Sequence, residues 1–139
     1  MITIKETTAK ELDNVKALWA DGDVMKFVGF PEGLLQTDDE MKAWLDWIES
    51  QRPQVNHYSI FDGSVYCGET FYSIDSKHGN SASMDIKLFG FARGKGIAAK
   101  ALSYWWHRVC TAEAFKADLG ALFQRLTGQF LDDSNDFAL

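Results

Sequence analysis

Apolar residues recur at helical spacing in two segments near the start of the chain. The first segment follows TAKE (8–11), which has the capping-box form Ser/Thr-x-x-Glu, and predicts a helix over residues 9–20. A second sequence of this form, TDDE (37–40), precedes another apolar stripe and predicts a helix over 38–51. Glycine and proline interrupt the stretch between them, so we expect residues 21–36 to form a loop with one helical turn.

After residue 51, the spacing of apolar residues changes from that of a helix to that of a strand. HYSIF (57–61) and SVYCGETFYSI (64–74) are strand-like, and Asp62-Gly63 between them is a strong signal for a tight hairpin. SASMDIKLF (81–89) predicts a third strand, because its apolar and polar residues alternate. Its alternation places Met84, Ile86 and Leu88 on one face and Ser83, Asp85 and Lys87 on the other.

Two further elements complete the expected order. A short strand is predicted over residues 2–5, and a helix with an apolar stripe runs from a glycine-rich loop to about Cys110. This order of elements predicts an α+β (mixed α/β) fold. The order is strand, helix, helix, a three-stranded antiparallel meander, a loop and a helix. We expect one domain over residues 1–139, with a mostly antiparallel sheet flanked by helices and a further helix over 112–130.

Composition narrows the class of protein. The 139 residues carry a net charge of −6, which argues against a nucleic-acid surface, since such surfaces cluster Lys and Arg. An acidic surface suits a cationic amine substrate. Two cysteines are too few for a disulfide framework, and no apolar run approaches the ~20 residues of a membrane span. We therefore expect a cytoplasmic protein without a membrane segment or a signal peptide.

The stretch FGFARGKGIAAKAL (89–102) carries the clearest candidate chemistry. A glycine-rich turn between a strand and a helix presents several backbone N–H groups in one direction, and the helix dipole adds partial positive charge there. The nucleotide P-loop does not fit, because Gly94-Lys95 is followed by Gly96 and not by Ser or Thr. The dinucleotide fingerprint fits poorly, because the preceding strand belongs to an antiparallel meander and not to the first strand of a βαβ unit.

A third pattern matches better. RGKGIA (93–98) has the form Arg/Gln-x-x-Gly-x-Gly/Ala, and so resembles the acyl-CoA signature of the GNAT superfamily of N-acetyltransferases. The two preceding strands and the order of elements from residue 1 to about 110 are also similar to that superfamily. The resemblance implies an enzyme that transfers an acetyl group from acetyl-CoA to a primary amine of a small molecule or a peptide.

The resemblance also implies roles for particular residues. The loop would hold the pyrophosphate of coenzyme A, and the strand before it would offer backbone groups to the pantetheine arm. The loop residues are Arg93, Gly94, Lys95, Gly96, Ile97 and Ala98, and the strand residues are Ile86, Lys87 and Leu88. Met25, Phe27, Phe30 and Trp44 fall in the region that usually forms the acceptor wall, although core packing is the alternative for Trp44.

Acyl transfer to an amine benefits from a general base. Asp85 is the first candidate, because an aspartate near this point lies at the substrate in some aminoglycoside acetyltransferases, and Glu69 on the neighbouring strand is the second. The alternative for both is a carboxylate on a solvated sheet face or in a structural ion pair. We expect His57 and His78 at the surface, and the histidines show no metal-ligand spacing.

The C-terminal part departs from the superfamily. The tyrosine that often protonates the thiolate would be Phe123 here, and no strand-like run appears between Cys110 and Gly120. A missing strand would leave a sheet edge exposed, which leads to the hypothesis of a homodimer through the C-terminal segment. Two alternatives to an active enzyme stay open: a CoA-binding module without turnover, and a structural or interaction protein with an incidental glycine loop.

Overall fold

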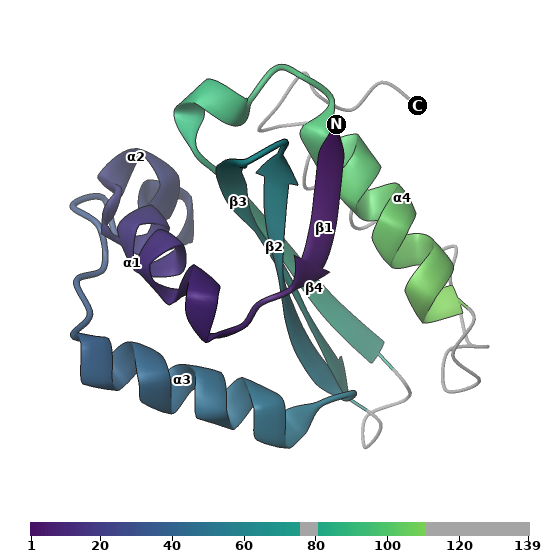
Figure 1. Cartoon of the computed structure of the whole chain (residues 1–139), viewed down its shortest axis with the longest axis horizontal. Coiled ribbons are helices and arrows are strands. Elements are labelled where there is room, and N and C mark those ends of the chain that lie inside the picture. The colour runs from purple at the N-terminus through teal and green to yellow at the C-terminus, as the bar shows by residue number, and fades with distance from the viewer. Residues whose placement is uncertain (76–80, 111–139) are drawn as a thin grey trace.

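The structure is a computed structural model, and it describes residues 1–75 and 81–110 (Figure 1). Four strands form one antiparallel sheet in the order β1-β2-β3-β4, so each strand lies beside its neighbour in sequence. The strands are β1 (Ile2–Glu6), β2 (Val55–Asp62), β3 (Val65–Asp75) and β4 (Ser81–Leu88). This arrangement confirms the α+β prediction and the predicted meander.

Helices cover both faces of the sheet. The elements on one face are η1 (Ala9–Glu11), α1 (Leu12–Ala20), α2 (Gly22–Met25), η2 (Lys26–Val28) and α3 (Asp38–Gln51). The helix α4 (Ile97–Cys110) crosses the opposite face and follows the short turn η3 (Gly90–Ala92) (Figure 1). Within the described ranges, no helix is long and apolar enough to cross a bilayer.

Both N-terminal helical segments begin at the capping boxes that the sequence predicted. The Thr8 side chain accepts from a backbone N–H of the first turn while Glu11 accepts from the Thr8 amide, which is the capping box. Thr37 and Glu40 form the same reciprocal pair, and α3 has the predicted bounds. The predicted loop over 21–36 holds α2 and η2, which are two short helical turns where one was expected.

The hairpin between β2 and β3 turns at Asp62-Gly63, as predicted. Gly63 has φ +59°, a left-handed conformation that glycine adopts without steric cost. The register then places Ser59 opposite Glu69, and Glu69 opposite Lys87. One polar row therefore runs across three strands, on the face that α1 and α3 cover.

Two apolar clusters hold these layers together. The cluster under α4 contains Ile60, Cys67, Leu88, Ala92, Ile97, Ala98 and Ala101. The cluster between the sheet and the N-terminal helices contains Val15, Leu18, Val24, Met25, Met41 and Tyr66. Together they fix the end of β4 and the start of α4, so the glycine loop is supported by packed residues on both sides.

Candidate active site at the end of strand β4

The glycine loop joins β4 to α4 and leaves its amides available. Gly94 and Gly96 have φ +76° and +73°, a backbone conformation that favours glycine. The first hydrogen bond of α4 runs from the Lys100 amide to the Gly96 carbonyl, at 3.2 Å. The amides in the first turn therefore have no partner within the helix, and the positive end of the helix dipole lies there. This is the local structure that binds phosphate groups.

The position that a side chain at Gly96 would occupy is open among the described residues. A Cβ atom built on Gly96 would meet no atom within 4 Å. The Lys95 side chain belongs to an exposed residue of the same loop, and it adds positive charge beside the amides. Among the described residues, Gly96 therefore leaves room for a ligand group to approach the backbone at this position.

Arg93 is placed differently from the rest of the loop. Its guanidinium donates to the backbone carbonyls of Asp23 and Leu88, both at 3.2 Å, and lies 5.4 Å from the Phe27 ring centroid. The side chain therefore ties the start of the loop to α2 and η2. As a consequence, the acceptor-side segment predicted over residues 21–36 contacts the predicted phosphate loop.

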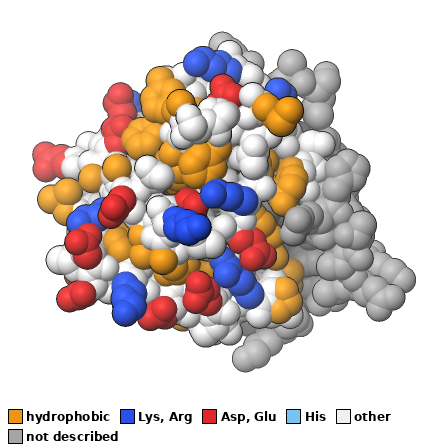
Figure 2. All heavy atoms as spheres, in the orientation of Figure 1, with side chains coloured by type: hydrophobic (Ala, Val, Ile, Leu, Met, Phe, Trp, Pro, Cys, Tyr) orange, Lys and Arg blue, Asp and Glu red, His pale blue; other side chains and the backbone are white. Residues whose placement is uncertain are grey.

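Exposed aromatic rings lie beside this connection. Phe27 and Phe30 in the predicted acceptor region are exposed, and so is Phe91 in η3, whose ring stacks on that of Phe89. Figure 2 shows hydrophobic side chains gathered on the upper part of this face, over α2 and the loop that leads to α4. Met25 is buried in the core, so it is unavailable to a substrate.

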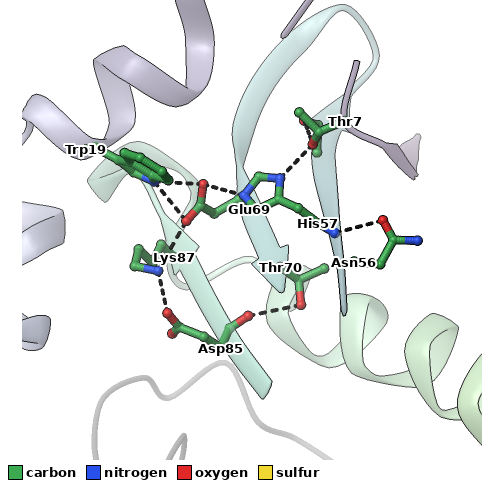
Figure 3. Close-up of polar contacts among 9 residues, drawn as sticks. Thr7, Trp19, Asn56, His57, Glu69, Thr70, Asp85 and Lys87 are labelled. Atoms are coloured by element: carbon green, nitrogen blue, oxygen red, sulfur yellow. Dashed lines mark hydrogen bonds and ion pairs between the residues drawn. The ribbon is translucent and has the colours of Figure 1, made fainter. Parts of the chain in front are cut away.

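A buried polar cluster lies deeper, between β3 and the helices α1 and α3 (Figure 3). At its centre is the Glu69 carboxylate, which is 2% exposed. The Trp19 indole N–H lies 3.0 Å from each of its oxygens. His57 Nε2 lies 2.8 Å from Oε2, and Lys87 Nζ lies 3.1 Å from Oε1.

These contacts occupy the acceptor capacity of Glu69. A carboxylate has about four lone-pair sites, and each oxygen here faces two donors. Burial raises the pKa of Glu69, but His57, Lys87 and Trp19 lower it by more, and the pKa falls from 4.5 to about 2. The carboxylate is therefore ionised and fully engaged, and it has little capacity to accept a substrate proton.

The cluster continues on both sides of Glu69. On the inner side, His57 Nδ1 lies 2.7 Å from the Thr7 hydroxyl, which lies 2.7 Å from the Ser59 hydroxyl. On the outer side, Lys87 also donates to the Asp85 carboxylate. Burial lowers the pKa of Lys87, but Glu69 and Asp85 outweigh it and raise the pKa above 10.5, so Lys87 stays charged.

The structure brings both candidate carboxylates into one ion-pair chain. Asp85 and Glu69 lie on the same sheet face and are joined through Lys87, and the exposed fraction of the side chain rises from 2% at Glu69 to 14% at Lys87. Asp85 is the more accessible of the two, with 34% of its side chain exposed. It is therefore the candidate that a substrate can reach.

One residue expectation was wrong and two participants were missed. His57 was expected at the surface, but it is the third residue of β2 and only 1% exposed, because Trp44 of α3 packs against its ring. Trp19 looked like part of a helical apolar stripe, and Lys87 was considered only for its backbone. The available signal was the cross-strand register, which sets Glu69 directly opposite Lys87.

Several expectations lie outside the described residues. These are the surface position of His78, the loss of the tyrosine at Phe123, the helix over 112–130 and the dimer through the C-terminal segment. Within the ranges 1–75 and 81–110, no group of three His, Cys, Asp or Glu residues could hold a metal ion.

Comparison with solved structures identifies the fold. The chain is similar to an N-acetyltransferase from Staphylococcus aureus, with TM-score 0.67, 17% identity, and 94% of this chain and 82% of that chain covered. It is similar to spermidine N-acetyltransferase from Vibrio cholerae, solved with CoA and spermine, with TM-score 0.63, 16% identity and coverage of 76% and 62%. It is also similar to glucosamine-6-phosphate N-acetyltransferase from Arabidopsis thaliana, with TM-score 0.63, 10% identity and coverage of 100% and 95%.

These similarities confirm a GNAT acetyltransferase fold. No protein-family model matches the sequence, and no curated protein matches it. The matched part spans 62% of the length of the Vibrio cholerae enzyme.

Proposed function

We propose that the chain is an acetyl-CoA-dependent N-acetyltransferase that acetylates a primary amine of a small molecule or a peptide. The observation that carries the proposal is the open glycine loop at the start of α4, within a GNAT fold. The loop amides from Gly94 to Ala98 bind the pyrophosphate of the donor. The backbone of Ile86–Leu88 in β4 follows the pantetheine arm toward the sheet interior.

Chemistry takes place beside Asp85. The amine nitrogen attacks the acetyl carbonyl carbon, the carbon–sulfur bond breaks, and sulfur keeps the electron pair. Before the attack, Asp85 takes one proton from the cationic amine and passes it to water, which frees the nitrogen lone pair. After the attack, the nitrogen loses a second proton to water, and the thiolate takes a proton from water. Asp85 serves this role better than Glu69, since its side chain is 34% exposed against 2%.

The acceptor approaches from the side of α2 and η2. Arg93 joins this segment to the phosphate loop, and Phe27 and Phe30 are exposed on it. The net charge of −6 favours an acceptor that arrives as a cation. Polyamines, amino sugars and peptide amines all present such a group.

Turnover tests the proposal directly. Free thiol release from acetyl-CoA is followed with a panel of polyamines, amino sugars and lysine-containing peptides, and mass spectrometry detects the acetylated product. We expect at least one amine to be acetylated, and Asp85→Asn to lose most of that activity at unchanged acetyl-CoA affinity. Acetyl-CoA binding without turnover across the panel would support the non-catalytic module instead. A folded protein that does not bind acetyl-CoA would refute the proposed donor site.

A further inference from the structure

An ion-pair chain runs from the interior toward the surface on the acceptor side of the sheet (Figure 3). Its members are Glu69, Lys87 and Asp85, whose side chains are 2%, 14% and 34% exposed in that order. Glu69 and Lys87 are directly opposite each other on β3 and β4, and Asp85 is two positions from Lys87 on the same face. The exposed carboxylate is thus connected to a buried one through a single ammonium group.

Several contacts hold the inner end of this chain. Trp19 and His57 hold Glu69 from α1 and β2, at 3.0 and 2.8 Å, and the Trp44 ring packs edge-on against His57 with 4.7 Å between centroids. A free lysine side chain samples many rotamers, and fixing it in one position costs conformational entropy. The Glu69 carboxylate offsets that cost, so the position of Lys87 Nζ is set by the core.

At the outer end of the ion-pair chain, one carboxylate oxygen of Asp85 is bound and the other is available. Lys87 contacts Oδ2 of Asp85, whereas Oδ1 has no partner in the part of the chain that the structure describes. The Asp85 carbonyl accepts from the Thr70 hydroxyl at 3.1 Å, which fixes the backbone at this residue. The free oxygen therefore has a defined position on the acceptor side.

We propose that Lys87 is a positioning residue that orients the Asp85 carboxylate, and that Glu69 is the buried anchor of Lys87. The inference rests on the proposed function, in which Asp85 accepts the proton of the attacking amine. Misplacing a reacting group by about 1 Å can lower the rate about 100-fold. A residue that fixes the orientation of the Asp85 carboxylate therefore contributes to the rate. In this arrangement Glu69 never exchanges a proton with substrate, and Lys87 keeps its own proton throughout.

A double-mutant cycle separates positioning from simple folding support. The variants are Lys87→Met, Asp85→Asn and the double variant that carries both substitutions. For each variant, kcat and KM are measured for acetyl-CoA and for the acceptor amine. We expect Lys87→Met to lower kcat about 10- to 100-fold with KM for acetyl-CoA unchanged. In the Asp85→Asn background, Lys87→Met should change kcat less than about twofold, because its target is already gone. Independent, multiplicative effects of the two substitutions would overturn the proposal.

Lys5→Met is the matched control. Lys5 pairs with the buried Glu11 at 2.8 Å on β1, so its loss removes a similar lysine–glutamate pair from the same sheet without touching Asp85. It should leave kcat within about twofold of the wild type. Lys87→Arg keeps the charge and should retain more activity than Lys87→Met. A kcat loss in Lys5→Met equal to that in Lys87→Met would show that general destabilisation causes both, which would overturn the positioning role.

A second measurement does not depend on turnover. An anchored ammonium exchanges its protons slowly and gives a proton–nitrogen NMR signal, which Lys87→Arg identifies by its absence. We expect that signal to persist in Asp85→Asn and to disappear in Glu69→Gln. The reverse pattern would show that Asp85 anchors Lys87 and would overturn the inference, even in a protein that acetylates no tested amine. A turnover failure with the expected NMR pattern would instead refute the proposed activity alone.

Discussion

The buried Glu69 carboxylate predicts a specific dependence of stability on pH. Its pKa is about 2 in the folded chain against 4.5 ordinarily, because Trp19, His57 and Lys87 favour the ionised form more than burial opposes it. A difference of about 2.5 pH units corresponds to about 3 kcal/mol of unfolding free energy at pH 7. A depressed carboxyl pKa stabilises the fold above pH 4.5, and this stabilisation is lost as the pH falls toward 2.

Glu69→Gln removes this contribution while keeping the shape of the side chain. We expect the variant to be less stable than the wild type by about 3 kcal/mol at pH 7, since removing one partner of a buried ion pair leaves the other poorly compensated. The difference should shrink between pH 5 and pH 2, because over this range the Glu69 carboxyl binds a proton in the unfolded chain before it does so in the folded one. Most domains of this size have about 5–15 kcal/mol of stability, so both proteins should remain folded at pH 7.

Urea unfolding followed by far-UV circular dichroism at several pH values measures the difference. This signal avoids the fluorescence of Trp19, whose indole contacts the substituted side chain. Glu49→Gln is the control, because Glu49 is exposed on α3, and it should differ from the wild type by less than about 0.5 kcal/mol at every pH. A Glu69→Gln difference that is the same at pH 7 and pH 2.5 would refute the reasoning.

Two other substitutions test the fold. The Tyr66 hydroxyl is buried, and among the described residues it lies near the Ser59 side chain without a hydrogen bond of ordinary geometry. Tyr66→Phe should therefore leave the free energy of unfolding unchanged or raise it, and a loss above about 1 kcal/mol in urea unfolding would reveal a hydrogen bond to Ser59. Thr37 caps α3, so Thr37→Ala should cost about 1 kcal/mol in urea unfolding while Thr37→Ser costs much less, and equal losses would exclude the hydroxyl as the cause.

The elements were predictable because their signals are local. Each capping box lies within four residues, and the Asp62-Gly63 turn joins two strands that alternate with period two, so short windows of sequence define these features. The glycine loop was predictable for the same reason. The anion site that we propose there rests on backbone geometry at the start of a helix, which a few residues determine.

The buried cluster was not predictable in the same way. Trp19 and Glu69 are 50 residues apart, and Glu69 and Lys87 are 18 apart, so their contacts depend on how helices dock onto the sheet. The alternation of apolar and polar residues placed Asp85 and Lys87 on one face of the strand. It does not show whether that face is exposed to water or covered by helices. For the same reason, the surface position expected for His57 was wrong, because α3 brings Trp44 against its ring.

Acetyl-CoA binding by calorimetry tests the central claim most directly, on the wild type, Gly96→Glu and Gly63→Glu. Both glycines have positive φ and open space for a Cβ, so the two variants share their backbone cost, but only Gly96 lies in the phosphate loop. We predict that Gly96→Glu weakens binding about 100-fold or more, equivalent to ~3 kcal/mol, while Gly63→Glu changes it less than about twofold. Equal binding by the wild type and Gly96→Glu, or no binding by a folded wild type, would contradict the account.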